Sequence, residues 1–178
     1  MYATLLTVMA FTPSVVAQKN KKMEAAQTDP LRDFELIVNH CVAWNKQFEA
    51  DRVAFNERTK KWGKQVNSPA KISYDVKRTD SLVSPFSAIM SIQNVAFVEN
   101  AETEDEIKVK SIAPDTSNAM ASTFNLNFAM QNGKWVTTGG TSSRTLRING
   151  KWERADKISL ELDLTSPTRP TEIRGCTP

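Results

Sequence analysis

Residues 120–135, MASTFNLNFAMQNGKW, combine the clearest strand pattern of the chain with the clearest turn. Phe124, Leu126 and Phe128 alternate with polar residues, and this period of two is typical of a strand buried on one face only. Asn132-Gly133 follows, and Asn-Gly is the preferred pair for a type I′ turn because both positions tolerate positive φ. The stretch therefore predicts an antiparallel hairpin.

The tetrapeptide Asn-Gly-Lys-Trp occurs again at residues 149–152, and this second copy predicts a second hairpin of the same kind. Shorter alternating runs lie at residues 72–76, 86–92 and 158–164. Together these patterns predict an antiparallel β-meander of about five strands between residues 71 and 165. Ser166-Pro167 ends the pattern, so residues 166–178 are predicted to form a C-terminal tail.

A long helix is predicted before these strands. Thr28 or Asp29 can cap it, Pro30 suits its first turn, and Gly63 can end it. Apolar side chains recur every seven residues along one face: Phe34, Cys41, Phe48, Phe55 and Trp62. A helix over residues 30–62 would be about 50 Å long, whereas a compact domain of this size is roughly 40 Å across. Its second half is therefore expected to project, to kink or to pack on another subunit.

The expected fold is α+β, with a long N-terminal helix packed on a curved antiparallel sheet in one domain over residues 30–178. Between residues 30 and 165 this order of elements resembles the nuclear-transport-factor-2-like and cystatin-like group, in which a long helix lies in the concave face of a bent sheet. The segment YDVKRTDSLVSPF at residues 74–86 looks like a family signature. Folds of this outline host enzymes, binding modules and assembly subunits alike, so the resemblance implies no particular activity. The Gln-x-Val-x-Gly wedge of cystatin-type inhibitors is missing.

The N-terminal segment resembles an export signal. Residues 1–17 carry no charged side chain and end in Val15-Val16-Ala17, the small-residue pattern that precedes signal-peptidase cleavage. We expect a cleaved signal peptide, a flexible tether over residues 18–29, and a periplasmic or secreted domain. A basic region before the apolar run is missing, and lysines follow the run at residues 19, 21 and 22. An uncleaved membrane anchor is therefore the alternative.

Export decides how the two cysteines are interpreted. Cys41 lies on the apolar stripe of the predicted helix, and Cys176 lies near the end of the chain. In an oxidising compartment we expect them to form a disulfide that joins the tail to the helix. The alternative is a buried thiol at Cys41 and an unrelated one at Cys176.

Charge and motifs exclude several classes of function. The chain has 23 basic and 20 acidic residues and a net charge of +3, which is too balanced for a typical nucleic-acid-binding protein. No cofactor or metal site is predicted, because the acidic run at residues 99–106 lacks the spacing of a calcium loop. The catalytic candidates are His40, the only histidine, which can act as a general base near neutral pH, and Asp75. His40 and Cys41 are adjacent and point about 100° apart on a helix, which does not suit a base and its nucleophile.

Aromatic and basic side chains supply the candidates for partner contact. Phe55, Arg58, Lys61 and Trp62 lie in the second half of the predicted helix, and Trp135 and Trp152 each follow an Asn-Gly turn. The alternative is that Phe55 and Trp62 cover a sheet edge, and that each of the other tryptophans packs its own turn against the sheet.

These observations favour an exported, non-enzymatic protein that binds another envelope protein or a second copy of itself, as an accessory or assembly subunit. Contact with a membrane is expected only if the N-terminal segment is retained. The alternative is a small-ligand-binding or hydrolytic domain of the nuclear-transport-factor-2-like type. In that case the pocket would lie between helix and sheet, and His40 or Asp75 would serve it.

Overall fold

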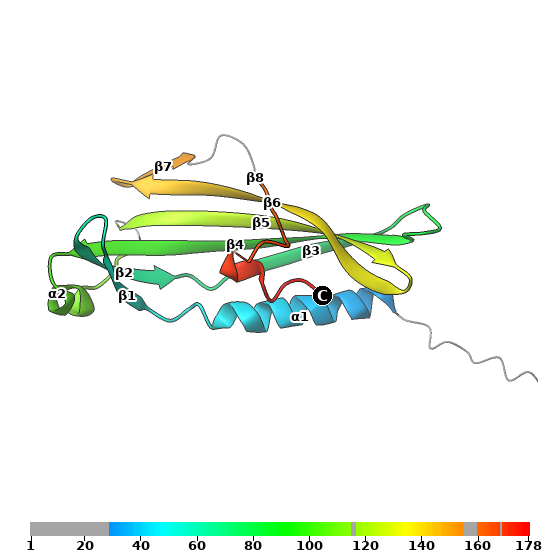
Figure 1. Ribbon diagram of the computed structural model, residues 1–178, viewed down its shortest axis with the longest axis horizontal. Helices are drawn as coiled ribbons and strands as arrows, with labels where there is room; N and C mark the ends of the chain where they lie inside the picture. The colour runs from blue at the N-terminus through cyan, green and yellow to red at the C-terminus, as the bar shows by residue number, and fades with distance from the viewer. Residues whose placement is uncertain (1–28, 115–116, 155–159, 168) are drawn as a thin grey trace, which may run out of the picture.

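The computed structural model describes residues 29–114, 117–154, 160–167 and 169–178. The predicted signal peptide and most of the predicted tether lie outside these residues. Figure 1 shows one long helix lying along a twisted antiparallel sheet, so the expected α+β class is confirmed. Within the described ranges, no helix combines the length and the apolar character that a bilayer span requires.

The helix α1 (Pro30–Lys46) begins where the sequence predicts and ends sixteen residues earlier. The Asp29 carboxylate caps it by accepting hydrogen bonds from the backbone N–H groups of Leu31 and Arg32. Phe34, Val38, Cys41 and Asn45 form its buried stripe, with the three- and four-residue spacing of an amphipathic helix.

The predicted helix over residues 30–62 is therefore wrong in its second half. That half contains the strand β1 (Arg52–Asn56) and the start of β2 (Lys61–Asn67), and the two strands form an antiparallel hairpin. Turn chemistry and cross-strand pairing outweigh the seven-residue repeat here. The Asn56 side chain accepts hydrogen bonds from the N–H groups of Arg58 and Thr59, and Lys60 adopts a positive φ of 56°.

The sheet has eight strands among the described residues, more than the five or so expected. The remaining strands are β3 (Lys71–Arg78), β4 (Phe86–Ala101), β5 (Asn118–Gln131), β6 (Lys134–Ile148), β7 (Lys151–Arg154) and β8 (Leu160–Glu161). The order is β1-β2-β4-β5-β6-β7, of which β4-β5-β6-β7 is a meander, and β8 also pairs with β6. Strand β4 pairs along one edge with both β2 and β3, which take its C-terminal and N-terminal halves respectively.

Both predicted Asn-Gly turns are confirmed. Asn132 and Gly133 have φ values of 51° and 74°, and Asn149 and Gly150 have values of 52° and 77°. These are the left-handed conformations that a type I′ turn requires. The last predicted strand, over residues 158–164, begins outside the described residues, and within them only Leu160–Glu161 is a strand, which is shorter than expected.

The main core lies between α1 and the face of the sheet made by β3, β4, β5 and β6. Phe34 packs edge-on against Phe128 and Trp135, with ring centroids 5.1 and 4.9 Å away. The Trp135 indole N–H donates to the carbonyl of Pro30 at 2.9 Å, so one residue joins the start of α1 to the sheet. A short helix, α2 (Glu104–Val109), packs on β1, β2 and β4 at the other end and buries Ile107.

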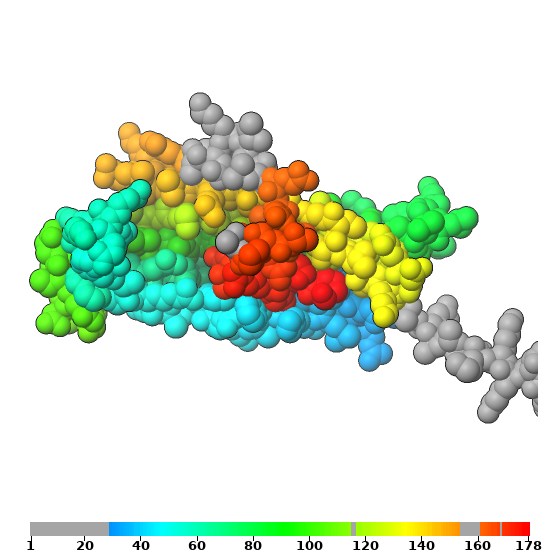
Figure 2. Space-filling model, in the orientation of Figure 1, coloured from blue at the N-terminus to red at the C-terminus, as the bar shows by residue number. Residues whose placement is uncertain are grey.

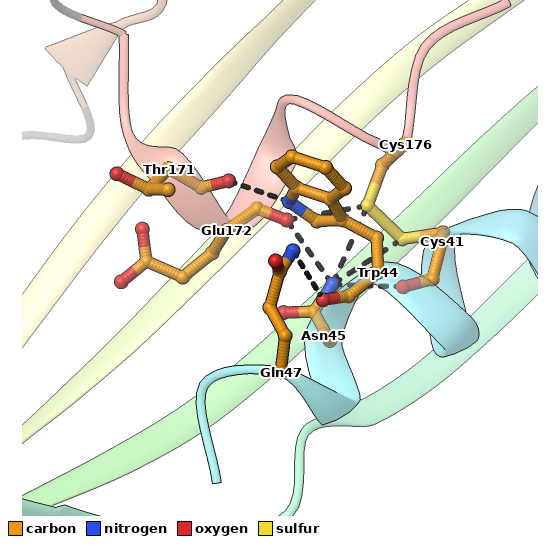
Figure 3. The surroundings of a disulfide bond; sticks show 7 residues. All are labelled: Cys41, Trp44, Asn45, Gln47, Thr171, Glu172 and Cys176. Atoms are coloured by element: carbon orange, nitrogen blue, oxygen red, sulfur yellow. Dashed lines mark hydrogen bonds between the residues drawn. A yellow bond between two sulfur atoms is a disulfide. The ribbon is translucent and has the colours of Figure 1, made fainter. Parts of the chain in front are cut away.

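The disulfide between Cys41 and Cys176 is present, as the sequence predicts, and both residues are fully buried (Figure 3). The chain reaches it through a short 3₁₀ turn, η1 (Thr171–Ile173), which lies against the C-terminal half of α1. The Trp44 indole donates to the Thr171 carbonyl at 2.8 Å, and the Asn45 amide donates to the Glu172 carbonyl at 3.1 Å. Covalent and polar contacts thus fix the tail to the helix.

Removal of the disulfide should lower the free energy of unfolding substantially. The bond closes a loop of 135 residues, for which the chain-entropy model gives a stabilisation of at most about 5 kcal/mol. We expect the Cys41→Ala/Cys176→Ala double variant to show a lower urea midpoint than the oxidised protein. A midpoint equal to that of the oxidised protein would show that the bond does not stabilise this fold.

Gly175→Ala should destabilise the attachment of the tail by steric overlap. A Cβ at this position would lie 2.3 Å from Cγ of Trp44, so the indole or the tail must move, at a cost of about 1–3 kcal/mol. Gly139→Ala is the matched control, because a Cβ there meets no atom within 4 Å. Equal unfolding midpoints for the two variants in thermal scans would contradict this packing.

Candidate functional site

The hairpin β1–β2 brings four of the predicted partner-binding residues together. Phe55 and Trp62 lie opposite each other in the register, with ring centroids 5.5 Å apart. Arg58 lies in the turn, and Lys61 begins β2. Phe55 is 40% exposed, and Arg58 and Lys61 are exposed as well. A short aromatic and basic surface therefore exists here, on a hairpin instead of a helix.

Acidic side chains of the neighbouring elements partly neutralise this surface. Lys61 forms an ion pair of 2.7 Å with Glu102, and the hydrogen bond that the Lys61 ammonium donates to the Glu102 carboxylate raises the pKa of Lys61. Glu104 pairs with Lys108 inside α2, at 2.6 Å. Three of the acidic residues at positions 99–106, Glu99, Glu102 and Glu104, are thus paired with lysines, and no cluster of three metal-ligating side chains occurs within the described part of the chain.

A hollow of about 540 Å³ adjoins the same hairpin. Successive side chains of a strand point to opposite faces, so Ala54 and Gly63 lie on the face opposite to Phe55 and Trp62, and both line the hollow. Its charged lining consists of three basic residues and one acidic residue: Arg52, Arg58, Lys64 and Glu57. Lys64 already pairs with Asp51 at 3.4 Å, so Arg52 and Arg58 are the basic side chains that favour an acidic occupant.

Strand β1 is also an edge of the sheet. In the described residues it pairs with β2 alone, and an edge strand presents unpaired N–H and C=O groups that another extended chain can use. Figure 2 shows the hairpin (cyan) standing at one end of the molecule. The combination of an edge strand, a basic hollow and an aromatic pair with one exposed ring, that of Phe55, is suited to binding an extended segment of a protein.

The catalytic candidates are placed differently. His40 is exposed on α1, and Asp75 is exposed on β3, where its carboxylate pairs with Lys77 at 2.9 Å. A hollow of about 300 Å³ does lie between α1 and β3, but Glu35, Val38, Asn39 and Tyr74 line it. Desolvation and the nearby Glu35 carboxylate raise the pKa of the Tyr74 hydroxyl. The structure therefore does not bring His40 and Asp75 into this hollow.

Trp135 and Trp152 do not form a common surface. Trp135 is only 5% exposed, so its prediction as a partner-binding residue is wrong; packing on Phe34 and bonding to Pro30 occupy its ring and its N–H. Trp152 is 48% exposed and lies on β7, at the opposite end of the strand order from β1. Its ring covers the guanidinium of Arg147, whose carbon lies 5.3 Å from the ring centroid.

Sequence reasoning missed the edge strand and its hollow. The apolar spacing from Phe48 to Trp62 fits one helix face, and the segment has no Asn-Gly or proline to mark a hairpin. The available signal was Asn56, which favours turns through its side-chain hydrogen bonds. Val53 and Phe55 add a short period-two run before it.

Comparisons of the chain with protein-family models, with curated proteins and with solved structures gave no match.

The two aromatic positions should differ sharply in their contribution to stability. Trp135→Ala removes a buried ring and the hydrogen bond to Pro30, so we expect a loss of about 3–5 kcal/mol in the free energy of unfolding. Phe55→Ala removes a half-exposed ring on an edge strand and should cost about 1 kcal/mol. Urea titrations of the two variants measure both values. A larger loss for Phe55→Ala would place that residue in the core.

Proposed function

We propose that this protein is an exported, non-enzymatic binding module, an accessory or assembly subunit of the cell envelope, whose contact surface is the hairpin β1–β2. The observation that carries the proposal is the aromatic pair of the exposed Phe55 and the half-buried Trp62, on an edge hairpin that also borders a basic hollow. Aromatic and arginine side chains are the residues enriched at the centres of protein interfaces.

The partner that fits this surface is an extended protein segment of acidic character. Backbone groups of β1 can pair with such a segment, and alternate side chains of the added strand would point toward the hollow. Arg52 and Arg58 lie where acidic side chains of the segment can reach them. Another envelope protein or a second copy of this chain can supply the segment.

Export remains part of the proposal. Two features support it: the uncharged residues 1–17 with their small-residue ending, and the Cys41–Cys176 disulfide, because such bonds persist in oxidising compartments. Cleavage would release the domain outside the cytoplasm, whereas in a retained anchor the positive-inside rule would place Lys19, Lys21 and Lys22, and the domain that follows them, on the cytoplasmic side.

A small-ligand-binding domain is the second candidate function, and the hollow at Tyr74 favours it. That hollow is lined by a carboxylate, an amide and a phenol, which can bind a small polar molecule. Isothermal titration of small polar ligands against Tyr74→Phe and the unchanged protein separates this function from the hairpin surface.

Photo-cross-linking tests the proposed surface. A benzophenone amino acid replacing Phe55 should form adducts in cells of the native source, and Arg58→Glu should reduce their yield several-fold by reversing a charge of the surface. Mass spectrometry of the adduct identifies an envelope partner or a second copy.

Leu36 supplies the matched control position, because it is an apolar residue, 62% exposed, on α1. Adducts should be absent when the same cross-linker stands there. The same adducts from positions 36 and 55, or yields unchanged by Arg58→Glu, would rule out the hairpin as the specific surface.

A further inference from the structure

The loop between β3 and β4, residues 79–85, presents two adjacent apolar side chains at its tip. Leu82 is 100% exposed and Val83 is 77% exposed. In Figures 1 and 2 the loop (green) projects beyond the body at one end of the molecule. Single exposed apolar residues are ordinary, but two neighbours at a projecting tip form a small contact surface for an apolar partner.

Hydrogen bonds within the loop hold this tip away from the body. The N–H of Thr79 donates to the Pro85 carbonyl at 2.9 Å, which closes the base of the loop. The N–H of Ser84 donates to the Ser81 hydroxyl at 3.1 Å, and the Thr79 hydroxyl donates to the Ser84 carbonyl. These hydrogen bonds fix the turn that exposes Leu82 and Val83.

This tip lies at the end of the molecule where α1 begins. In the register Arg78 pairs with Phe86 at the base of the loop, and the next residue of β4 pairs with Ala129, close to the β5–β6 turn. Just after that turn, Trp135 donates its hydrogen bond to the carbonyl of Pro30. The loop, the β5–β6 turn and the first residue of α1 therefore share one end, and the chain N-terminal to Pro30 joins the domain there.

We propose that the tip of the β3–β4 loop inserts into the surface of a lipid bilayer. This contact concerns the form of the chain that retains the uncharged residues 1–17, which would hold it at the bilayer and which join the domain at this same end through about twelve further residues. Two side chains are far too small for a stable protein interface, which needs roughly 800 Å² on each partner. They are sufficient for shallow insertion that supplements another anchor.

The charges around the tip fit a lipid surface without strong selectivity for anionic lipids. Lys77 pairs with Asp75, and Arg78 and Asp80 flank the apolar residues with opposite charges. The contact is therefore chiefly apolar, and phosphatidylcholine vesicles should support it. The sixteen residues of β4 then hold the hairpin β1–β2 roughly 50 Å from the bilayer. This inference is independent of the partner proposed for that hairpin.

An environment-sensitive dye on the tip tests the insertion. The native cysteines are joined in a disulfide, so Leu82→Cys gives one reactive thiol in the full chain, residues 1–178. With phosphatidylcholine vesicles, the dye at position 82 should show a blue-shifted emission. Lipids with a spin label high on the acyl chain should quench that emission.

Val109→Cys is the matched control, because Val109 is apolar, 86% exposed and located on α2, which packs at the other end of β4. Its emission should stay unchanged with vesicles. A dye on Val83→Cys, combined with Leu82→Ser, should show a shift reduced several-fold. No shift at position 82, equal shifts at positions 82 and 109, or failure of the full chain to sediment with vesicles would each overturn the proposal.

Discussion

The attachment of the C-terminal tail to α1 is the constraint on which the rest of this structure depends. Cys176 is bonded to Cys41, and Gly175 leaves room for the Trp44 ring that lies against it. Ile173 adds a fully buried side chain to the core cluster beneath the helix. One short segment thus joins the two ends of the domain, and through α1 it supports the aromatic packing around Phe34.

This arrangement places the disulfide-linked core under α1 and the proposed contact surface on the hairpin β1–β2 in different parts of the molecule. The helix and the tail cover the face of the sheet that α1 packs on. Trp135 is buried in that core and donates its indole N–H to the Pro30 carbonyl. The hairpin β1–β2 lies beyond the end of α1, and within the described ranges α2 packs on it while α1 and the tail do not. The partner proposed for this hairpin would contact the exposed Phe55 without displacing the core under α1.

Local turn chemistry explains how much of the fold was predictable. The two Asn-Gly turns and the alternation around Phe124 depend on neighbouring residues only, and the hairpins they predict are present. The spacing of Phe48, Phe55 and Trp62 is compatible with a continued helix and also with the β1–β2 hairpin. It therefore does not decide where α1 ends. Cross-strand pairing with Gly63 opposite Ala54 decides it, and no local pattern expresses that pairing. The disulfide was predictable because the compartment, and not the spacing of the cysteines, suggested it. The hollow beside the β1–β2 hairpin was not predictable, because it depends on how three strands curve together.

The oxidation state of Cys41 and Cys176 in the protein's own cells tests the central claim most directly. A disulfide between them supports export to an oxidising compartment and fixes the tail to α1. Cells are quenched with acid, free thiols are alkylated under denaturing conditions, and peptides of the endogenous protein are examined by mass spectrometry. The account predicts one linked peptide pair containing Cys41 and Cys176, with neither cysteine alkylated. Recovery of both cysteines in the alkylated form would contradict it.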